Sequence, residues 1–228
     1  MVLAAPLVAV AAPLVAVPSG DYQPLKAMEV EHVSDGFEAA VLARLGQAMG
    51  REISVRAGAE GGVADLRIGI VSSGPVYYSS PLTALTAAGS GPQSWNEIRG
   101  KTVCLSEGSP HGDAIESRFG GVVRHYPSAA QALIGLKLGE CQAVAGGLAL
   151  LEPIAHLPEW RRYNRLLPVQ HTYSVTLRVE AEDPVLKGQL QQILTDEAGR
   201  AIFAETVQYW VDEVAFQAYV LADTLDCH

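Results

Sequence analysis

The chain has 228 residues, of which 49% are hydrophobic and 18% are charged. With a mean hydropathy of +0.16 this composition is typical of an ordered globular protein, and the length suits one large domain or two small lobes. Lysine and arginine number 16 against 25 aspartates and glutamates, so the formal net charge is −9. An acidic chain without clustered basic residues is not expected to bind nucleic acid or an anionic membrane surface.

The longest apolar stretch lies at the N-terminus, over residues 1–17. Its prolines and its short length argue against a membrane-spanning helix. The stretch lacks the basic start of a secretory signal, although Ala9-Val10-Ala11 resembles a cleavage site. We interpret residues 1–11 as an apolar remnant of a signal or linker, and the residues after them as the first strand.

The elements that follow predict an α/β unit. A strand is expected over 13–17, ending in a turn that contains Gly20. A helix is expected over 36–49, because apolar residues recur on one of its faces, and Gly50 ends it. Short strands are expected over 52–56 and 65–71. A strand, a helix and two further strands with short links suggest right-handed crossovers in one lobe.

The chain then crosses into a second α/β unit near residues 82–88 and returns near 172–179. Helices are expected in this unit over 92–98, 112–119, 128–138 and 148–156. A return strand is expected over 173–179, followed by helices over 185–195 and 197–219. The last helix has a core-like apolar stripe, formed by Phe203, Val207, Trp210, Val211 and Val214.

An apolar strand over 102–105 enters the turn 106–110, which opens the helix expected over 112–119. Unpaired backbone N–H groups and the positive end of the helix dipole point out of such a turn. The turn is therefore predicted to suit an anionic group.

Three cysteines are present, Cys104, Cys141 and Cys227. The first two fall in predicted strands of the same unit, so they form either a disulfide, if the strands are neighbours, or two buried thiols. The pair Cys227-His228 is interpreted as a frayed tail rather than a metal site. The Cys and His spacing does not match a zinc motif.

Several segments in this order resemble the type II periplasmic solute-binding proteins, specifically bacterial extracellular solute-binding protein family 3, which includes amino-acid receptors. The segments are 15–25, 35–45 with its Gly36-Phe37-Glu38 start, 77–81, 100–110, 130–133, 139–144 and 181–186. The chain resembles a divergent and shortened member. The resemblance implies a periplasmic monomer and an α/β, two-lobed periplasmic-binding-protein type II fold with two hinge crossings. Lobe 1 would comprise 12–84 plus 175–228, and lobe 2 would comprise 85–174. Export favours a disulfide between Cys104 and Cys141.

The resemblance also implies a function: capture of a small polar or anionic solute between the lobes, for delivery to the membrane permease of an ABC importer. Tyr22 would form an aromatic wall, Ser109 would hold an anionic group, and Ser72 and Ser73 would offer hydroxyls. Alternatively, Tyr22 packs within its turn and Ser109 caps a helix. His111 is expected to be exposed at a helix start. The full set of expected ligand-binding residues is Asp21, Tyr22, Ser72, Ser73, Tyr77, Glu107, Gly108, Ser109 and His111.

The sequence departs from the family at both groups that bind a zwitterion. The strand over 66–71 runs into Ser72 without the arginine that clamps a ligand carboxylate, and 145–147 lack the aspartate that binds an ammonium. An alternative is therefore an accessory protein on the same scaffold, with an eroded ligand site, which contacts a periplasmic dehydrogenase. A third hypothesis is a dehydratase-type enzyme using Asp21, Glu107 or His111, but the sequence favours a protein that is not an enzyme and needs no cofactor or metal.

Overall fold

The computed structural model describes residues 12–27, 35–56 and 64–225. The expected remnant 1–11 and the pair Cys227-His228 lie outside these ranges. The strands are β1 (Leu14–Ser19), β2 (Ile53–Val55), β3 (Leu66–Gly69), β4 (Val76–Thr86), β5 (Thr102–Ser106), β6 (Val122–Tyr126), β7 (Ala143–Gly147), β8 (Arg165–Leu166) and β9 (Gln170–Ala181). The helices are α1 (Phe37–Met49), α2 (Ala129–Lys137), α3 (Leu148–His156), α4 (Pro184–Thr195) and α5 (Glu197–Leu225), with short turns η1 (Trp95–Ile98), η2 (Ala114–Arg118) and η3 (Pro158–Trp160).

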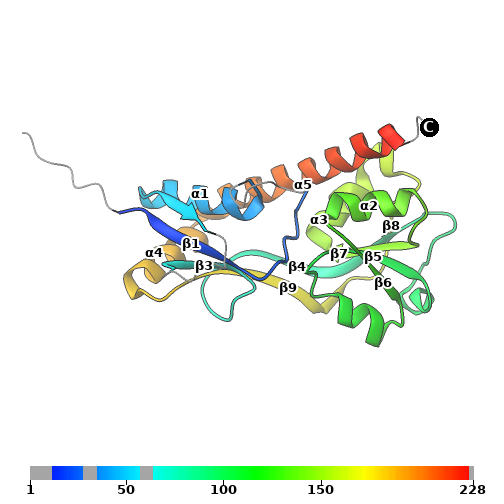
Figure 1. Ribbon diagram of the computed structural model, residues 1–228, viewed down its shortest axis with the longest axis horizontal. Helices are drawn as coiled ribbons and strands as arrows, with labels where there is room; N and C mark the ends of the chain where they lie inside the picture. Colours follow the sequence, from blue (N-terminus) through cyan, green and yellow to red (C-terminus); the bar gives the residue numbers. More distant parts are fainter. Residues whose placement is uncertain (1–11, 28–34, 57–63, 226–228) are drawn as a thin grey trace, which may run out of the picture.

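The strands of the described ranges form one hydrogen-bonded sheet in the order β2-β1-β3-β9-β4-β7-β5-β6, with β8 paired to β4. β1 runs parallel to β2 and β3 on either side of it, and β5 runs parallel to β6 and β7. We call the elements around β1, with α1 and α4, the first lobe. The elements around β5, with β8, α2 and α3, form the second lobe (Figure 1).

Two long strands join the lobes. β4 has 11 residues and β9 has 12, and they pair antiparallel from Val76↔Arg178 to Leu82↔Gln170. The far end of β9 pairs with β3 in the first lobe, and the far end of β4 pairs with β7 in the second. The two expected crossings are thus strands that are hydrogen-bonded to each other, which makes one sheet continuous through both lobes.

The first lobe follows the sequence pattern closely. α1 ends at Gly50, whose φ of 64° is left-handed and favours glycine. The predicted apolar face of α1 is buried, with Phe37, Val41, Leu42 and Leu45 each at most 2% exposed. Spacing alone located this face because an amphipathic helix buries residues that recur every three to four positions.

The second lobe differs in its short helices. The helix expected over 112–119 is present over residues 112–118, with π-helical geometry over Ala114–Arg118, and the one expected over 92–98 is the 3₁₀ turn Trp95–Ile98. α2 and α3 agree with the sequence pattern, and Ser128 caps α2 by accepting a hydrogen bond from the Gln131 N–H. Between β5 and residue 112 the backbone forms turns.

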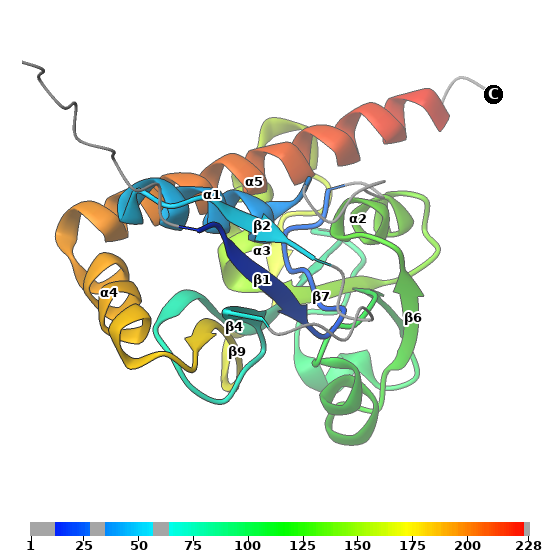
Figure 2. The same cartoon turned by 60° about the vertical axis from the view of Figure 1, so that its left-hand side comes forward.

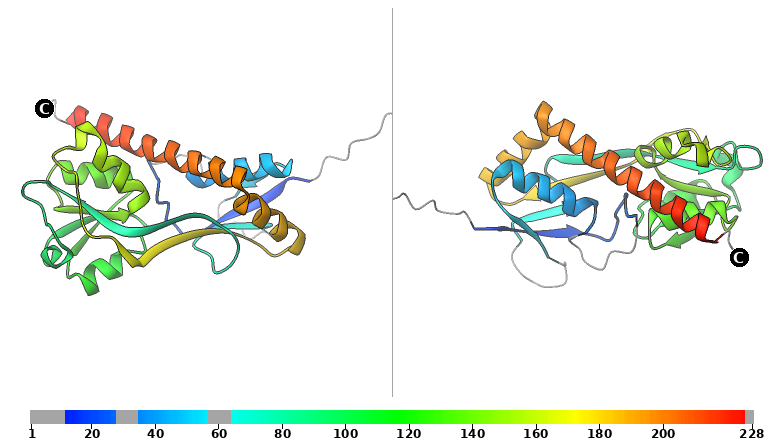
Figure 3. Two further views of the ribbon diagram at one scale, coloured as in Figure 1. Left: turned by 180° about the vertical axis from the view of Figure 1, so that it is seen from behind. Right: turned by 90° about the horizontal axis from the view of Figure 1, so that it is seen from above.

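α5 runs along both lobes as a strap. It is 29 residues long and packs against α1 and α4 of the first lobe and against α2 and α3 of the second (Figures 1, 2 and 3). The predicted stripe is confirmed, since Phe203, Val211 and Val214 are buried while Val207 and Trp210 are partly buried. None of the helices in the described ranges is both long and apolar enough to cross a lipid bilayer.

The disulfide between Cys104 and Cys141 is present, with the Cα atoms 5.8 Å apart. Cys104 lies on β5, whereas Cys141 lies just before β7 rather than inside a strand. β5 and β7 are parallel neighbours, paired at Val103↔Ala143 and Cys104↔Val144, so the predicted condition for the bond is met.

Removing this disulfide should destabilise the protein, because the bond closes a loop between two cysteines that are 37 residues apart in the sequence. We expect the double variant Cys104→Ser, Cys141→Ser to lower the free energy of unfolding by about 2–4 kcal/mol, measured by urea denaturation. Cys227→Ser, outside the described residues, is the matched control. An unchanged urea midpoint when the wild type is reduced would contradict the expectation.

Leu25 lies in the segment between the lobes and is fully buried in the main hydrophobic core. Leu25→Ala leaves a cavity there, so we expect it to lower the free energy of unfolding by about 2–5 kcal/mol. Leu138→Ala removes the same atoms from a side chain that is 48% exposed, so its effect should stay within about 0.5 kcal/mol. Equal losses of unfolding free energy in the two variants would show that packing of the Leu25 segment does not stabilise the fold.

Candidate functional site

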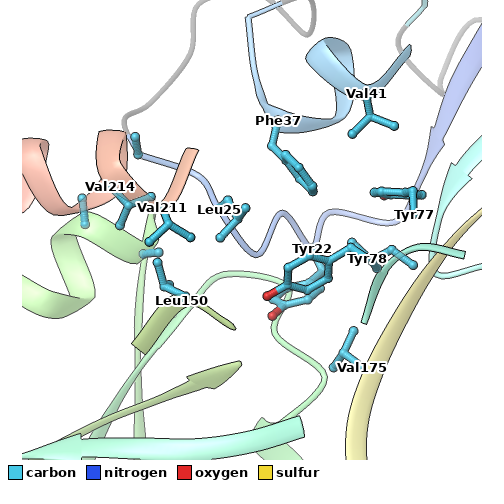
Figure 4. Close-up of a cluster of buried hydrophobic side chains, with 14 of the residues drawn as sticks. Tyr22, Leu25, Phe37, Val41, Tyr77, Tyr78, Leu150, Val175, Val211 and Val214 are labelled. Carbon is cyan, nitrogen blue, oxygen red and sulfur yellow. The ribbon is translucent and has the colours of Figure 1, made fainter. Parts of the chain in front are cut away.

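Four aromatic side chains meet where the lobes join. Tyr22 follows β1, Phe37 begins α1, and Tyr77 and Tyr78 lie on β4, with all four at most 8% exposed. The ring of Phe37 lies 5.9 Å from that of Tyr77 and 5.8 Å from that of Tyr78, the latter edge to face. In Figure 4, Phe37 points from α1 toward the rings of Tyr22 and Tyr78. The ring of Tyr22 is thus packed against neighbours rather than open to solvent, and its expected role as an aromatic wall for a ligand stays a prediction.

The backbones of the two lobes touch beside Tyr22. A Cβ added at Gly108, in the turn after β5, would lie 2.8 Å from the carbonyl carbon of Asp21 and from the backbone nitrogen of Tyr22. The φ of Gly108 is 69°, so glycine is required there for conformation as well as for space. Nearby, the Ala129 N–H at the start of α2 donates to the Lys26 carbonyl over 3.0 Å. The junction is therefore closed by direct backbone contact.

A carboxylate lies within this aromatic region. Glu38 follows Phe37 in α1 and is only 7% exposed. Burial raises the pKa of Glu38 from its ordinary value of 4.5 to about 7, although its own backbone N–H partly offsets the shift. Its Oε1 atom has no hydrogen-bond partner among the described residues. An unpaired buried carboxyl costs free energy, so its presence calls for an explanation.

The tyrosines around this carboxyl stay neutral near neutral pH. Burial is the main cause that raises the pKa of Tyr78 to about 12, and the nearby Glu38 carboxylate raises it further. Burial also raises the pKa of Tyr22 and of Tyr77 well above the ordinary value, with Glu38 again contributing. The junction can therefore offer neutral hydroxyls, aromatic faces and one acidic group.

The turn after β5 contributes less to anion binding than its sequence suggests. Glu107 and Gly108 are exposed, and Ser109 is partly buried, with its Oγ accepting a weak hydrogen bond from the His111 N–H at 3.4 Å. Pro110 has no N–H to donate. The helix that follows is short, over residues 112–118, and most of it is π-helical, so its dipole is small.

The expected exposure of His111 is wrong. The side chain is 2% exposed, and burial lowers the pKa of its imidazole to about 4, so the ring is neutral at physiological pH. Its Nε2 atom has no partner among the described residues. A helix does begin beside His111, since the Ile115 N–H donates to its carbonyl, but tertiary packing covers the ring, which local sequence does not specify.

The hydroxyls expected from the first lobe lie in the loop after β3. Ser72 is exposed, and Ser73 donates to the Glu180 carboxylate on β9. Asp21 is exposed beside Tyr22. Of the expected residues, the structure thus brings Asp21 and Tyr22 together with Gly108. Ser73 instead has a partner within its own lobe, Glu180. The roles of all the expected residues in ligand binding stay predictions.

Sequence reasoning missed Phe37, Glu38 and Tyr78 as members of this region. Phe37 and Glu38 were visible as part of the Gly-Phe-Glu helix start, and Tyr78 adjoins the expected Tyr77. The position of Glu38, directly after the first apolar residue of an amphipathic helix, was a usable signal of burial, because it places the carboxylate beside the buried face of the helix.

A cavity of about 330 Å³ lies beside β4, next to these tyrosines. Tyr77 and Tyr78 line it together with the start of α3 and one side of α5 from Arg200 to Gln208. A second cavity, of about 600 Å³, lies in the second lobe beside the loop 87–91 and near Arg161 and Arg162. Within the described ranges, His, Cys, Asp and Glu side chains form no group of three that could hold a metal ion.

Comparison with known proteins supports the architecture. No protein-family model matches the sequence, and no curated protein sequence does. An amino-acid ABC transporter substrate-binding protein from Streptococcus pneumoniae, bound to L-arginine, matches with a TM-score of 0.61 at 11% identity, covering 88% of this chain and 94% of that one. An arginine transport periplasmic binding protein from Legionella pneumophila matches at 0.59 with 13% identity, covering 87% and 99%. The GluR0 ligand-binding core in complex with L-glutamate matches at 0.59 with 16% identity, covering 88% and 99%.

At these identities the similarity shows the fold alone. It confirms the predicted class, an α/β two-lobed periplasmic-binding-protein type II fold with two crossings. The divergence from these proteins is large, as the sequence suggested. The fold by itself assigns no ligand to this chain.

The raised pKa of Glu38 makes the stability depend on pH. The protonated form is favoured in the folded state, so this contribution is fully present below pH 4.5 and is lost as pH rises through about 7. At pH 8 we expect Glu38→Gln to be more stable than the wild type by about 3 kcal/mol, a difference that vanishes near pH 4. Urea unfolding from pH 4 to pH 8 measures it.

Two features make this test specific. Glu205→Gln, at an exposed position on α5, is the matched control and should follow the wild-type profile. Both variants retain the other charged or titratable groups near Glu38, which are Tyr22, Lys26, Asp35, Tyr77, Tyr78 and Glu213. Parallel profiles for wild type and Glu38→Gln would contradict the raised pKa.

Proposed function

We propose that this protein is a substrate-binding protein that holds a small polar solute between its two lobes and delivers it to the permease of an ABC importer. The observation that carries the proposal is the convergence of both lobes on one place, where Gly108 packs against the backbone beside Tyr22. Ligands of two-lobed receptors bind where both lobes can contact them at once, since only then does binding favour closure. The similarity to amino-acid substrate-binding proteins over most of the chain supports the same conclusion.

In this proposal the tyrosine faces provide apolar contact and Ser109 provides a hydroxyl from the second lobe. Ser72, Tyr77, Glu107 and the neutral ring of His111 are the further groups that a solute would meet when the lobes part. The missing arginine disfavours an ordinary amino-acid carboxylate as the main anchor. The sequence contains no nucleophile–base motif of the kind used in catalysis. This is consistent with a protein that binds its solute in the periplasm without changing it chemically.

Ligand entry requires an open form that differs from the closed one described here. The contacts of α5 with α2 and α3 span the same gap as the two crossing strands, so opening costs apolar contact on that side. A solute would therefore act by population shift, gaining contacts in the closed state that repay the opening.

A second candidate is an accessory protein that acts by protein–protein contact. The observation that favours it is a row of exposed apolar side chains on α5: Ile202, Tyr209 and Phe216 are spaced by seven residues, and Val220 follows four residues later. Seven-residue spacing places them on one helical face, which is a common way for helices to dock. In this reading the closed junction is permanent.

A thermal-unfolding screen against amino acids, organic acids, sugars and polyamines tests the proposed function. A ligand at about 100 times its Kd stabilises the folded state by about 2.7 kcal/mol, which raises Tm by roughly 5–10 °C for a chain of this size. Ser109→Ala should then weaken the identified ligand about tenfold, whereas the exposed control Ser90→Ala should not. A panel without any stabilising compound would reject the first candidate and favour the second.

A further inference from the structure

A third cavity lies on the α5 side of the junction, apart from the contact between Tyr22 and Gly108. Its volume is about 240 Å³. It is partly open to solvent and lies between the segment after Tyr22, the start of α1 and the middle of α5, where Tyr209 is exposed. The lining residues are Gln23, Lys26, Ala27, Asp35, Gly36, Phe37, Glu38, Tyr209, Trp210 and Glu213.

The walls combine aromatic faces with negative charge. Phe37, Tyr209 and Trp210 supply the rings, and those of Tyr209 and Trp210 meet edge to face with centroids 5.7 Å apart. Three carboxyl groups and one lysine line the same space, so the lining is net acidic when Glu38 is ionised. Aromatic faces and carboxylates are the two groups that bind an organic cation.

An independent observation points to a ligand. The side chain of Glu38 is only 7% exposed, and its Oε1 has no hydrogen-bond partner among the described residues. Its Oε2 lies 4.0 Å from the position of a Cβ at Gly36, which itself lines the cavity. Glu38 therefore lines the cavity through the Oε2 side of its carboxyl, while the unpaired Oε1 is buried and not accessible from the cavity. A cation placed there would pair with it.

The chemistry of the cavity selects an organic cation over a metal ion. A metal would need several carboxylates within one coordination sphere, and in the described ranges no three acidic, His or Cys side chains are grouped in that way. Rings on the opposite wall favour a weakly hydrated alkylammonium, which is attracted to an aromatic face and loses little on leaving water.

We propose that this cavity is a binding site for a small alkylammonium cation, held by Glu38 against the rings of Phe37, Tyr209 and Trp210. The site is distinct from the one proposed at the contact of Gly108 with Tyr22, and it does not depend on Ser109. It lies under α5, whose contacts with both lobes would be reinforced when the cavity is filled.

Lys26 also lines this cavity and is the one positively charged residue of its lining, so its charge opposes a bound cation. Its side chain can be changed without touching the backbone bond from Ala129 to the Lys26 carbonyl. Removing that positive charge should favour a bound cation, whereas neutralising Glu38 should disfavour it. Two substitutions in one cavity are thus expected to act in opposite directions.

Isothermal titration of the full chain with choline tests the proposal, using dimethylbutanol as the neutral analogue in which carbon replaces nitrogen. We expect choline to bind and its affinity to fall on the order of tenfold or more in Glu38→Gln, with the neutral analogue weaker by a similar factor. Lys26→Met should bind choline more tightly than the wild type. Glu205→Gln, the exposed control on α5, should bind as the wild type does.

The outcomes separate this site from the proposed interlobe site. Loss of choline binding in Ser109→Ala but not in Glu38→Gln would overturn the proposal and assign the cation to the junction. Equal binding of choline and its neutral analogue, or no binding of choline to the wild type, would also overturn it. Urea unfolding of each variant shows whether it is folded, and Glu38→Gln is expected to be at least as stable as the wild type at pH 8.

Discussion

The structure depends on burial of the short segment that follows β1 in the space between the lobes. Leu25 is fully buried there, and the main hydrophobic core runs without interruption from the first lobe through this segment into α2, α3 and α5. The carbonyl of Lys26 and the N–H of Ala129 satisfy each other at the same place. Water is therefore excluded from the junction by apolar packing, and one core cluster extends through both lobes, beside a second cluster that lies within the second lobe alone.

This shared core constrains any function that needs lobe motion. A hinge requires that few contacts besides the crossing strands span the gap. Here β4 and β9 span it on one side and α5 on another, so opening must separate buried Val211 and Val214 from their neighbours or carry α5 with one lobe. Because the described form is already closed, this cost falls on ligand entry and exit rather than on closure, which favours slow exchange of a solute or a protein whose closed form is its working form.

Two acidic or basic side chains are nearly fully buried in the described ranges. Glu38 and His111 are both nearly fully buried, each with an atom that lacks a partner among the described residues. Burial moves the pKa of both toward the neutral form, upward for the carboxyl and downward for the imidazole. A site with neutral hydroxyls and one carboxyl that is partly ionised near pH 7 suits a neutral or cationic solute better than an anion.

The sequence by itself determined the local elements, because hydrophobic periodicity and glycine or proline punctuation act over a few residues. It located α1, α3 and the two crossings, and it identified Cys104 and Cys141 as a pair whose bond depended on strand adjacency. Tertiary structure alone decided what depends on residues far apart in the chain. It decided the inward turn of His111, the closure at Gly108 and the length of the strap α5, because side-chain burial is set by packing between elements that no local pattern specifies. The environment of Glu38 is the clearest case. Its position on a helix was readable, but its pKa and its cavity arise only where α1, β4 and α5 meet.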